Sequence, residues 1–342
     1  MKTHRVIVLF TILAVILAAC GSSAPPLATP TVSPEPTVAS SKPFRVAAIM
    51  PSAVNDLAFS QSMYDALIRI QNEMGGPEKM QFVYSQGMFI VDDAAAAIRT
   101  YASQGYDLVI AHGSQYGESL QKIAPDFPEI SFAWGTSNNT LGLPNVFAYE
   151  AASQEGGYVN GVLAATLSTS KLIGVIGPIE VGDAKLYIDG FKAGVAATNP
   201  ETQVNVAYIG SFSDVVLAAD TAAMHISSGA DVLTGSAQMV VGATGKASEN
   251  NVLWFGTQSN QSSLAPAIVV ASHVYHWEVV LKEMINKIQS GTLGGESFTI
   301  NLANGGEVIE YNPEYAISAA AKALGDKTVR GIANGTITIT LP

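Results

Sequence analysis

The sequence predicts an α/β protein with two lobes, each built around a doubly wound parallel sheet. From Phe44 onward, short apolar runs alternate with amphipathic segments, which is the pattern of strands joined by helical, right-handed crossovers. The runs are continuously apolar, as expected for parallel strands that are covered on both faces. The chain has 342 residues, and this length exceeds what one hydrophobic core usually covers. We therefore expect two lobes.

The expected strands are short and are followed by loops that mix glycine with small polar residues. They lie at residues 45–50, 80–85, 108–111, 130–134, 172–176, 203–209, 232–233, 252–255 and 268–272. So many strands exceed the usual size of a single sheet, which again favours two sheets.

Apolar residues recur at helical spacing between these strands. Phe59, Met63, Leu67, Ile70 and Met74 lie three or four residues apart and form one apolar face. Similar patterns predict helices at residues 92–103, 152–167, 183–198, 215–228 and 275–290.

Residues typical of helix ends flank the helical segments. Asp92, Asp183 and Asp214 stand where N-caps are expected, because a short acidic side chain can accept a hydrogen bond from a free backbone amide. Gly105 and Gly229 stand where two helical patterns stop, as C-terminal glycines commonly do.

The N-terminus has the pattern of a secretory signal. The basic residues Lys2 and Arg5 precede the apolar run 6–19, which is shorter than the roughly 20 residues that span a bilayer. Residues 17–21 read Leu-Ala-Ala-Cys-Gly and resemble the lipobox of bacterial lipoproteins, which implies cleavage before Cys20 and attachment of a diacylglyceryl group to its thiol, with fatty acyl chains such as palmitate. The alternative is an ordinary signal peptide that happens to contain a cysteine.

The segment that follows Cys20 predicts a tether. Residues 20–42 are rich in proline, serine and threonine and contain no aromatic residue, so they cannot bury enough apolar surface to fold. No second apolar stretch of spanning length follows in the sequence. We expect a protein anchored by lipid to the extracytoplasmic face of a bacterial cell membrane.

Composition excludes several classes of protein. Lys and Arg total 17 against 28 Asp and Glu, with a net charge of −11, so a basic nucleic-acid binder is excluded. A hydrophobic fraction of 48% excludes disorder for most of the chain. A single cysteine excludes an intramolecular disulfide and any metal site made of several cysteines.

Motifs for catalysis or cofactor binding are missing. The sequence has no Gly-x-x-x-x-Gly-Lys-Ser/Thr loop and no Gly-x-Gly-x-x-Gly after its first strand. Residues 113–117 have the spacing of a nucleophile elbow, but Gln115 stands where the serine is required. His273 and His276 could share a metal, although packed or capping histidines are the simpler interpretation. We expect no enzyme activity, no metal and no cofactor.

Polar loops follow most of the predicted strands. They are residues 51–59, 111–115, 134–136, 177–183, 210–214, 234–238 and 256–261. In doubly wound sheets ligands bind outside the carboxyl ends of the strands. The loops therefore predict a polar, uncharged cleft between the lobes, where Phe59 either stacks on a flat ligand or packs into the core.

Four motifs carry a resemblance to a known family. They are Asn-Asp-Leu-Ala-Phe-Ser-Gln-Ser at 55–62, Gly-Pro at 177–178 with Asp-Gly-Phe-Lys-Ala-Gly at 189–194, Gly-Ser-Phe-Ser-Asp at 210–214, and Gly-Ala-Asp-Val at 229–232. With these motifs the chain resembles the basic membrane protein (BMP) family of solute-binding lipoproteins, similar to the PnrA-like purine nucleoside receptors of ABC importers, over roughly residues 44 to 313. The resemblance implies a type I periplasmic binding protein fold, in which two α/β lobes are joined by a hinge and close over the ligand.

The resemblance also implies roles for single residues. Phe59 and Phe212 match the aromatic pair that stacks on the purine, and Asn55 matches a polar residue that recognises the base. Nucleoside-binding members usually carry two aspartates where this chain has Gln258 and Asn260, within Gly-Thr-Gln-Ser-Asn-Gln at 256–261, and commonly a lysine where it has Tyr275. Since those charged groups hold the ribose hydroxyls in the family, a free base such as adenine is expected here as well as a nucleoside.

The candidate ligand-binding residues combine the loops with the positions that the resemblance singles out. They are Asn55, Asp56, Phe59, Gly113, Ser114, Gln115, Trp134, Gly182, Phe212, Gly235, Gln258 and Tyr275.

The expected organisation has four parts. Residues 1–19 form the signal peptide, 20–42 the lipidated cysteine and tether, 43–148 with about 267–298 the N-terminal lobe, and 149–266 with about 299–342 the C-terminal lobe. The expected function is that of a monomeric receptor that delivers a purine-type ligand to an ABC permease. The alternatives are a sensory lipoprotein without a transporter and a surface enzyme that acts on nucleosides.

Overall fold

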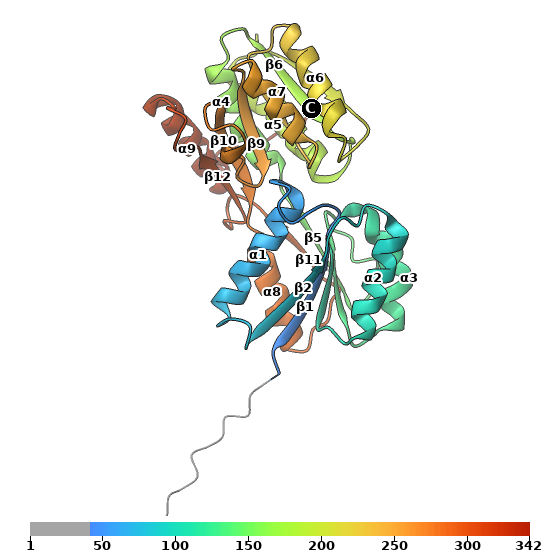
Figure 1. The fold of residues 1–342 in the computed structure, drawn as a ribbon. Coiled ribbons are helices and arrows are strands. Elements are labelled where there is room, and N and C mark those ends of the chain that lie inside the picture. The colour runs from blue at the N-terminus through green and yellow to red at the C-terminus, as the bar shows by residue number, and fades with distance from the viewer. Residues whose placement is uncertain (1–41) are drawn as a thin grey trace, which may run out of the picture. The chain divides into compact units, whose positions relative to one another are not determined.

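The computed structural model describes residues 42–342, and Figure 1 shows their fold. The expected signal segment 1–19 and Cys20 lie outside the described residues, as does the expected tether except for Lys42. Within the described part of the chain, no helix is long and apolar enough to cross a membrane.

Two sheets of six strands organise the described residues. The first contains β1 (Phe44–Ile49), β2 (Met80–Ser85), β3 (Leu108–Ala111), β4 (Ser131–Gly135), β5 (Val146–Ala151) and β11 (Ser297–Ile300), in the order β11-β5-β4-β3-β1-β2. The second contains β6 (Leu172–Gly177), β7 (Gln203–Tyr208), β8 (Val232–Gly235), β9 (Leu253–Gln258), β10 (Val269–Tyr275) and β12 (Glu307–Tyr311), in the order β12-β10-β9-β8-β6-β7. All pairs are parallel except β10 with β12. The predicted class, two doubly wound α/β lobes, is confirmed.

Helices cover both faces of each sheet (Figure 1). They are α1 (Phe59–Glu73), α2 (Val91–Ser103), α3 (Gly117–Ile123), α4 (Gln154–Leu167), α5 (Gly182–Thr198), α6 (Val215–Ser227), α7 (Val240–Glu249), α8 (Glu278–Gln289) and α9 (Ala319–Ala333). In the first lobe α1 and α8 share one core, and α2 and α3 share the core on the other face. In the second lobe α4, α5 and α9 cover one face and α6 and α7 the other. Strands buried from both sides explain why the runs are continuously apolar.

The chain passes between the lobes three times: between β5 and α4, between β10 and α8, and between β11 and β12. The structure corrects the second expected boundary, which was near residue 267. Strand β10 is buried along its whole length and pairs with β9 and β12, so it belongs to the second sheet. The chain returns to the first lobe only after Tyr275. The first boundary also lies later than expected, because β5 continues in the first sheet to Ala151.

Helix ends agree with the sequence in part. Asp214 is the N-cap of α6 and accepts a hydrogen bond from the Leu217 amide at 2.9 Å. Asp92 and Asp183 lie instead in the first turns of α2 and α5, each of which begins one residue earlier. Their carboxylates complement the helix dipole without capping.

Candidate functional site

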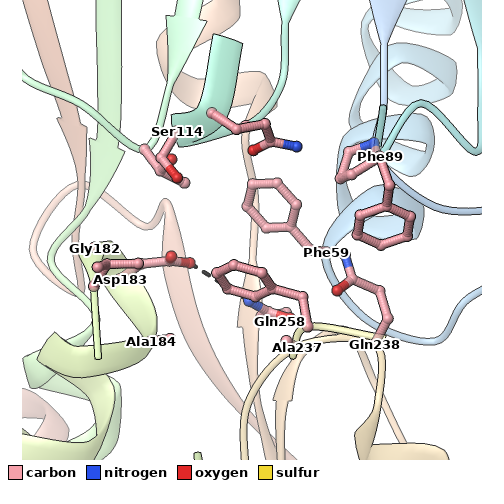
Figure 2. Close-up of a pocket in the computed structure, with 15 residues that line it drawn as sticks. Phe59, Phe89, Ser114, Gly182, Asp183, Ala184, Ala237, Gln238 and Gln258 are labelled. Atoms are coloured by element: carbon pink, nitrogen blue, oxygen red, sulfur yellow. Dashed lines mark hydrogen bonds between the residues drawn. The ribbon is translucent and has the colours of Figure 1, made fainter. Parts of the chain in front are cut away.

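One pocket lies at the carboxyl ends of strands from both sheets, where the two lobes meet. It is lined by Pro51, Phe59, Phe89, Gly113, Ser114, Gln115, Thr136, Val181, Gly182, Asp183, Ala184, Phe212, Ala237, Gln238 and Gln258. The space between these residues, including its opening to solvent, measures about 470 Å³. Figure 2 shows Phe59 and Ser114 on one side of the pocket and Asp183, Ala237 and Gln258 on the other. The position agrees with the rule that doubly wound sheets bind ligands at this edge.

The structure brings many of the sequence-predicted residues together here. The lining includes Phe59, Gly113, Ser114, Gln115, Gly182, Phe212 and Gln258. The other predicted residues, Asn55, Asp56, Trp134, Gly235 and Tyr275, do not line it.

Phe59 is the first residue of α1 and is held from behind by other rings. Its ring stacks on the His112 imidazole, with the centroids 3.8 Å apart and the planes 5° from parallel. The indole of Trp277 meets the Phe59 ring edge-on at 6.3 Å. Only 6% of Phe59 is exposed, so the residue both faces the pocket and belongs to the core of the first lobe. Core packing, one of the two roles that the sequence left open, is therefore present, and the ring also lines the pocket.

His112 is completely buried between Phe59 and Tyr149. Its Nδ1 lies 2.7 Å from the Tyr149 hydroxyl and its Nε2 lies 3.2 Å from the Phe59 carbonyl oxygen. Burial lowers the pKa of His112 to about 3, because the charged imidazolium loses its hydration there. At neutral pH the ring behind Phe59 is therefore uncharged.

Phe212 reaches the pocket from the loop between β7 and α6. This loop is fixed through its backbone, since the Phe212 carbonyl accepts a hydrogen bond from the Met239 amide at 3.0 Å. The Ser211 hydroxyl also accepts from the amide of Asp214 at 3.1 Å. Phe59 and Phe212 thus reach one cavity from different lobes.

Asp183 places a carboxyl group in the pocket, although the sequence predicted an uncharged cleft. Its Oδ2 accepts hydrogen bonds from the Tyr275 hydroxyl at 3.2 Å and from Gln258 Nε2 at 3.4 Å. Burial raises the pKa of this carboxyl group, and the hydrogen bonds from Tyr275, from Gln258 and from backbone amides offset the rise in part. The cleft is therefore acidic at one point.

Two glutamines complete the polar part of the pocket. Gln238 is 9% exposed and Gln258 3% exposed, and the side-chain oxygen of each is buried without a hydrogen-bond partner among the described residues. A buried acceptor without a donor is costly. These oxygens are suited to a ligand that donates hydrogen bonds.

Of the predicted residues in the loop after β1, Asp56 supports the pocket without lining it. The Asp56 carboxylate accepts hydrogen bonds from the amides of Ala58, Ser60 and Gln61 and thereby shapes the start of α1. Asn55 is exposed to solvent.

Trp134 and Gly235 contact the segments that line the pocket without lining it themselves. Trp134 donates from Nε1 to the Gly113 carbonyl at 3.1 Å and packs so closely on Gly117 that a Cβ there would lie 2.3 Å from the indole. Gly235 allows close approach of β6, since its Cβ would lie 2.7 Å from the Ile176 carbonyl oxygen.

The backbone is strained around the cavity. Thr136, Ala237 and Gln258 line it and have φ values of 59°, 74° and 69°, in the left-handed region that side chains other than glycine rarely adopt. Gly182, at φ 54°, opens α5 in the same region. Strain of this kind persists where function requires a fixed geometry.

Sequence reasoning missed several lining residues. Asp183 ends the predicted polar loop 177–183, but it was singled out only as a helix cap and not as a ligand-binding candidate. The loop after β2 that carries Phe89 was not among the predicted polar loops. Both residues follow strands of the predicted sheets, so the rule about strand ends was a signal that could have found them.

The histidine pair of the sequence makes no metal site. His273 lies completely buried with its Nε2 3.0 Å from Glu307 Oε2, while His276 lies 3.7 Å from Glu278. Among residues 42–342, no group of three or more His, Cys, Asp and Glu could hold a metal ion. The pocket itself combines aromatic side chains, which can stack on a planar ring, with polar side chains, which can form hydrogen bonds with the edge of that ring.

Comparisons with known proteins agree with this geometry. Residues 44–337 match the family described as "ABC transporter substrate-binding protein PnrA-like".

Three relatives are similar at low identity. A purine-binding protein of Brucella abortus (strain 2308) is 26% identical over 75% of this chain and 72% of its own length. The transcriptional activator protein Med of Bacillus subtilis (strain 168) is 24% identical over 88% of both chains. The ABC transporter nucleoside-binding protein BmpA of Lactococcus lactis is 25% identical over 84% of this chain and 86% of its own length.

Two solved structures share the fold. A solute-binding protein of an ABC transporter from Conexibacter woesei superposes with a TM-score of 0.71 at 23% identity, covering 87% of this chain and 98% of its own. Another, from Aeropyrum pernix K1, gives 0.73 at 20% identity, covering 88% and 94%.

Proposed function

Because the chain belongs to the PnrA-like family of ABC transporter substrate-binding proteins, we propose that it captures a purine base or a purine nucleoside between its lobes and delivers it to an ABC permease. Solute binding is the shared property of the family. The proposal adds three specific parts: the ligand is a purine, the partner is an ABC permease, and the protein does not catalyse a reaction.

One observation carries the proposal: two phenylalanines from different lobes, Phe59 and Phe212, face the same cavity. A flat heteroaromatic ring offers a π-face to each of them, and stacking of a base on an aromatic side chain contributes about 1–3 kcal/mol. Relatives named for binding purines and nucleosides support the same ligand class.

We further propose that the protein is a monomer held at the extracytoplasmic face of the membrane by a lipid on Cys20. The sequence pattern of residues 1–20 supports this location. Each buried CH₂ of an acyl chain contributes about 0.8 kcal/mol, so a diacylglyceryl group would hold the protein firmly. Mass spectrometry of protein extracted from membranes tests this, since a Cys20→Ser variant should lack the lipid and appear in the soluble fraction.

A thermal-unfolding panel tests the ligand class. Residues 42–342 form one compact unit, so this fragment is incubated with purine bases, purine nucleosides, pyrimidines, sugars and amino acids. A ligand at 100 times its dissociation constant stabilises the folded state by about 2.7 kcal/mol. We expect purines alone to raise the melting temperature and to be recovered unchanged. Stabilisation by another class would contradict the purine assignment, and conversion of a nucleoside would establish an enzyme.

A second function is favoured by one relative, the activator protein Med, which aligns over 88% of both chains. In that case the chain would sense the solute without importing it. Uptake of radiolabelled adenine by cells with and without the gene separates the two functions. Loss of uptake supports transport, whereas unchanged uptake with altered transcription supports sensing.

A further inference from the structure

The polar edge of the pocket is made of hydrogen-bond acceptors. Asp183 reaches it from the first turn of α5, and Gln258 reaches it from the end of β9 (Figure 2). Among the residues that line the pocket, none is a lysine, an arginine or a histidine. No charged donor is therefore present to satisfy these acceptors.

The orientation of the Gln258 amide is fixed by its neighbour. A carboxylate only accepts hydrogen bonds, so Gln258 must turn Nε2 toward Asp183 Oδ2, which it meets at 3.4 Å. The amide oxygen Oε1 then points away from Asp183 and has no hydrogen-bond partner among the described residues. It is buried, since only 3% of Gln258 is exposed.

Asp183 supplies a second acceptor. The side-chain hydrogen bonds from Tyr275 and Gln258 both end on Oδ2, and the amides of Asp183 and Ala184 also donate to this carboxylate. Oδ1 receives no side-chain hydrogen bond within residues 42–342 and belongs to a residue that lines the cavity. A carboxylate oxygen can accept more than one hydrogen bond, so Asp183 Oδ1 can take a donor from a ligand beside Gln258 Oε1, which has none among the described residues.

We infer that Asp183 and Gln258 form a selectivity pair that admits planar rings carrying an exocyclic amino group and rejects their oxo counterparts. This rests on the proposed function and narrows it. An amino group has two hydrogens, one for each acceptor. An oxo group in the same position brings a third acceptor against the first two, and it gives a donor neither to Gln258 Oε1 nor to Asp183 Oδ1. Each buried polar group without a partner lowers affinity by about fivefold or more, so the discrimination is large.

Tyr275 is a positioning residue for this pair. Its hydroxyl lies 2.6 Å from the Ser153 hydroxyl and 3.2 Å from Asp183 Oδ2. By donating to Oδ2, Tyr275 and Gln258 hold this oxygen and leave Oδ1 free of side-chain hydrogen bonds within the described residues.

Calorimetry with two matched pairs of ligands tests the inference. The purified protein is titrated with adenine and hypoxanthine, and with cytosine and uracil, which differ mainly in exchanging an amino for an oxo group. We expect adenine to bind at least about fivefold more tightly than hypoxanthine, the lower bound that one unpaired buried group gives.

Two variants assign the effect to Asp183. In Asp183→Asn the new amide oxygen accepts from Tyr275 and Gln258, so its NH₂ group faces the ligand and the preference for adenine should fall below about threefold or reverse. Asp183→Ser should lose the preference without gaining affinity for hypoxanthine. Asp220→Asn makes the same chemical change at an exposed position of α6 and should keep the wild-type preference. A melting curve of each variant reports whether it is folded.

The outcomes separate this inference from the proposed function. Equal binding of adenine and hypoxanthine, or a preference that survives in Asp183→Asn, would overturn the selectivity pair while purine binding stands. Binding of cytosine that depends on Asp183, with no purine bound, would overturn purine binding and support the pair. If none of the four compounds binds, both are overturned.

Discussion

The two lobes build their sides of the pocket in different ways. On the N-terminal side, Phe59 is part of the hydrophobic core and stacks on the buried His112 ring at 3.8 Å. On the C-terminal side, Phe212 sits on a loop held by backbone hydrogen bonds, beside the polar groups of Asp183 and Gln258. One side is an extension of the core, and the other consists of loops and helix starts.

The difference indicates a division of labour. A ring fixed by other rings provides a stacking surface that is present before any ligand arrives, and this lowers the ordering cost of binding. Polar groups on loops can be exchanged during evolution without disturbing a core. We therefore expect substitutions on the N-terminal side to change both stability and binding, and those on the C-terminal side to change binding and selectivity.

The sequence predicted the aromatic residues of the pocket better than its acidic group. Phe59 and Phe212 could be found because each follows a strand and fits a motif. Asp183 ends a predicted cleft loop but was not singled out, because an aspartate at a helix start usually serves the helix, and only the packing of Tyr275 and Gln258 around it gives it a second role.

The sequence also predicted most, but not all, of the strands. Continuous apolar runs identified most central strands. Strand β5 was overlooked because the chain crosses between the lobes directly after it, and β12 because half-exposed residues obscure its pattern. Which sheet β10 joins depends on pairing between distant segments, and no local pattern encodes that.

Replacing Phe59 with alanine should have the largest effect, because it damages the core and the stacking surface together. Loss of a buried phenylalanine costs about 3–5 kcal/mol of unfolding free energy, and ligand affinity should fall as well. Chemical denaturation and calorimetry measure the two effects. A variant with wild-type stability would contradict the interpretation of Phe59 as a core residue.

Phe212→Ala should separate binding from stability. Removing this ring should weaken a stacked purine by about 1–3 kcal/mol, the contribution of one base–aromatic contact. Because the loop is held through its backbone, the unfolding free energy should change by less than about 1 kcal/mol, as is usual for substitutions outside the core. A loss of stability as large as that of Phe59→Ala would erase the distinction between the two sides.

The buried imidazole makes the N-terminal side sensitive to acid. The pKa of His112 is about 3 in the folded protein and near 6.5 when unfolded, so the unfolded state binds more protons between these values. This residue therefore contributes stability at pH 7 that is lost as the pH falls below about 6.5, by at most about 1.4 kcal/mol per pH unit.

Urea denaturation at pH 7 and pH 5 should give a larger loss of unfolding free energy for the wild type than for His112→Gln. The comparison cancels the contributions of Asp183 and Glu307, whose raised pKa values act in the opposite direction. Equal losses would mean that His112 takes up its proton without unfolding.

The smallest expected effect concerns a contact between the two sides themselves. The Ser259 hydroxyl, after β9, donates to the Ala58 carbonyl at 2.7 Å, immediately before Phe59. Ser259→Ala removes this hydrogen bond and should weaken ligand binding by about 0.5–1.5 kcal/mol, the usual net worth of such a bond. Gln261, which donates from Nε2 to the Leu57 carbonyl at 3.1 Å, continues to hold the lobes together, so the effect should stay within about tenfold.

Ser262→Ala, in the short helix that follows, is the matched control and should bind like the wild type. A faster dissociation rate with an unchanged association rate would show that the Ser259 bond acts after closure, when the aromatic and polar sides already enclose the ligand. A change confined to the association rate would instead assign it to the approach of the lobes.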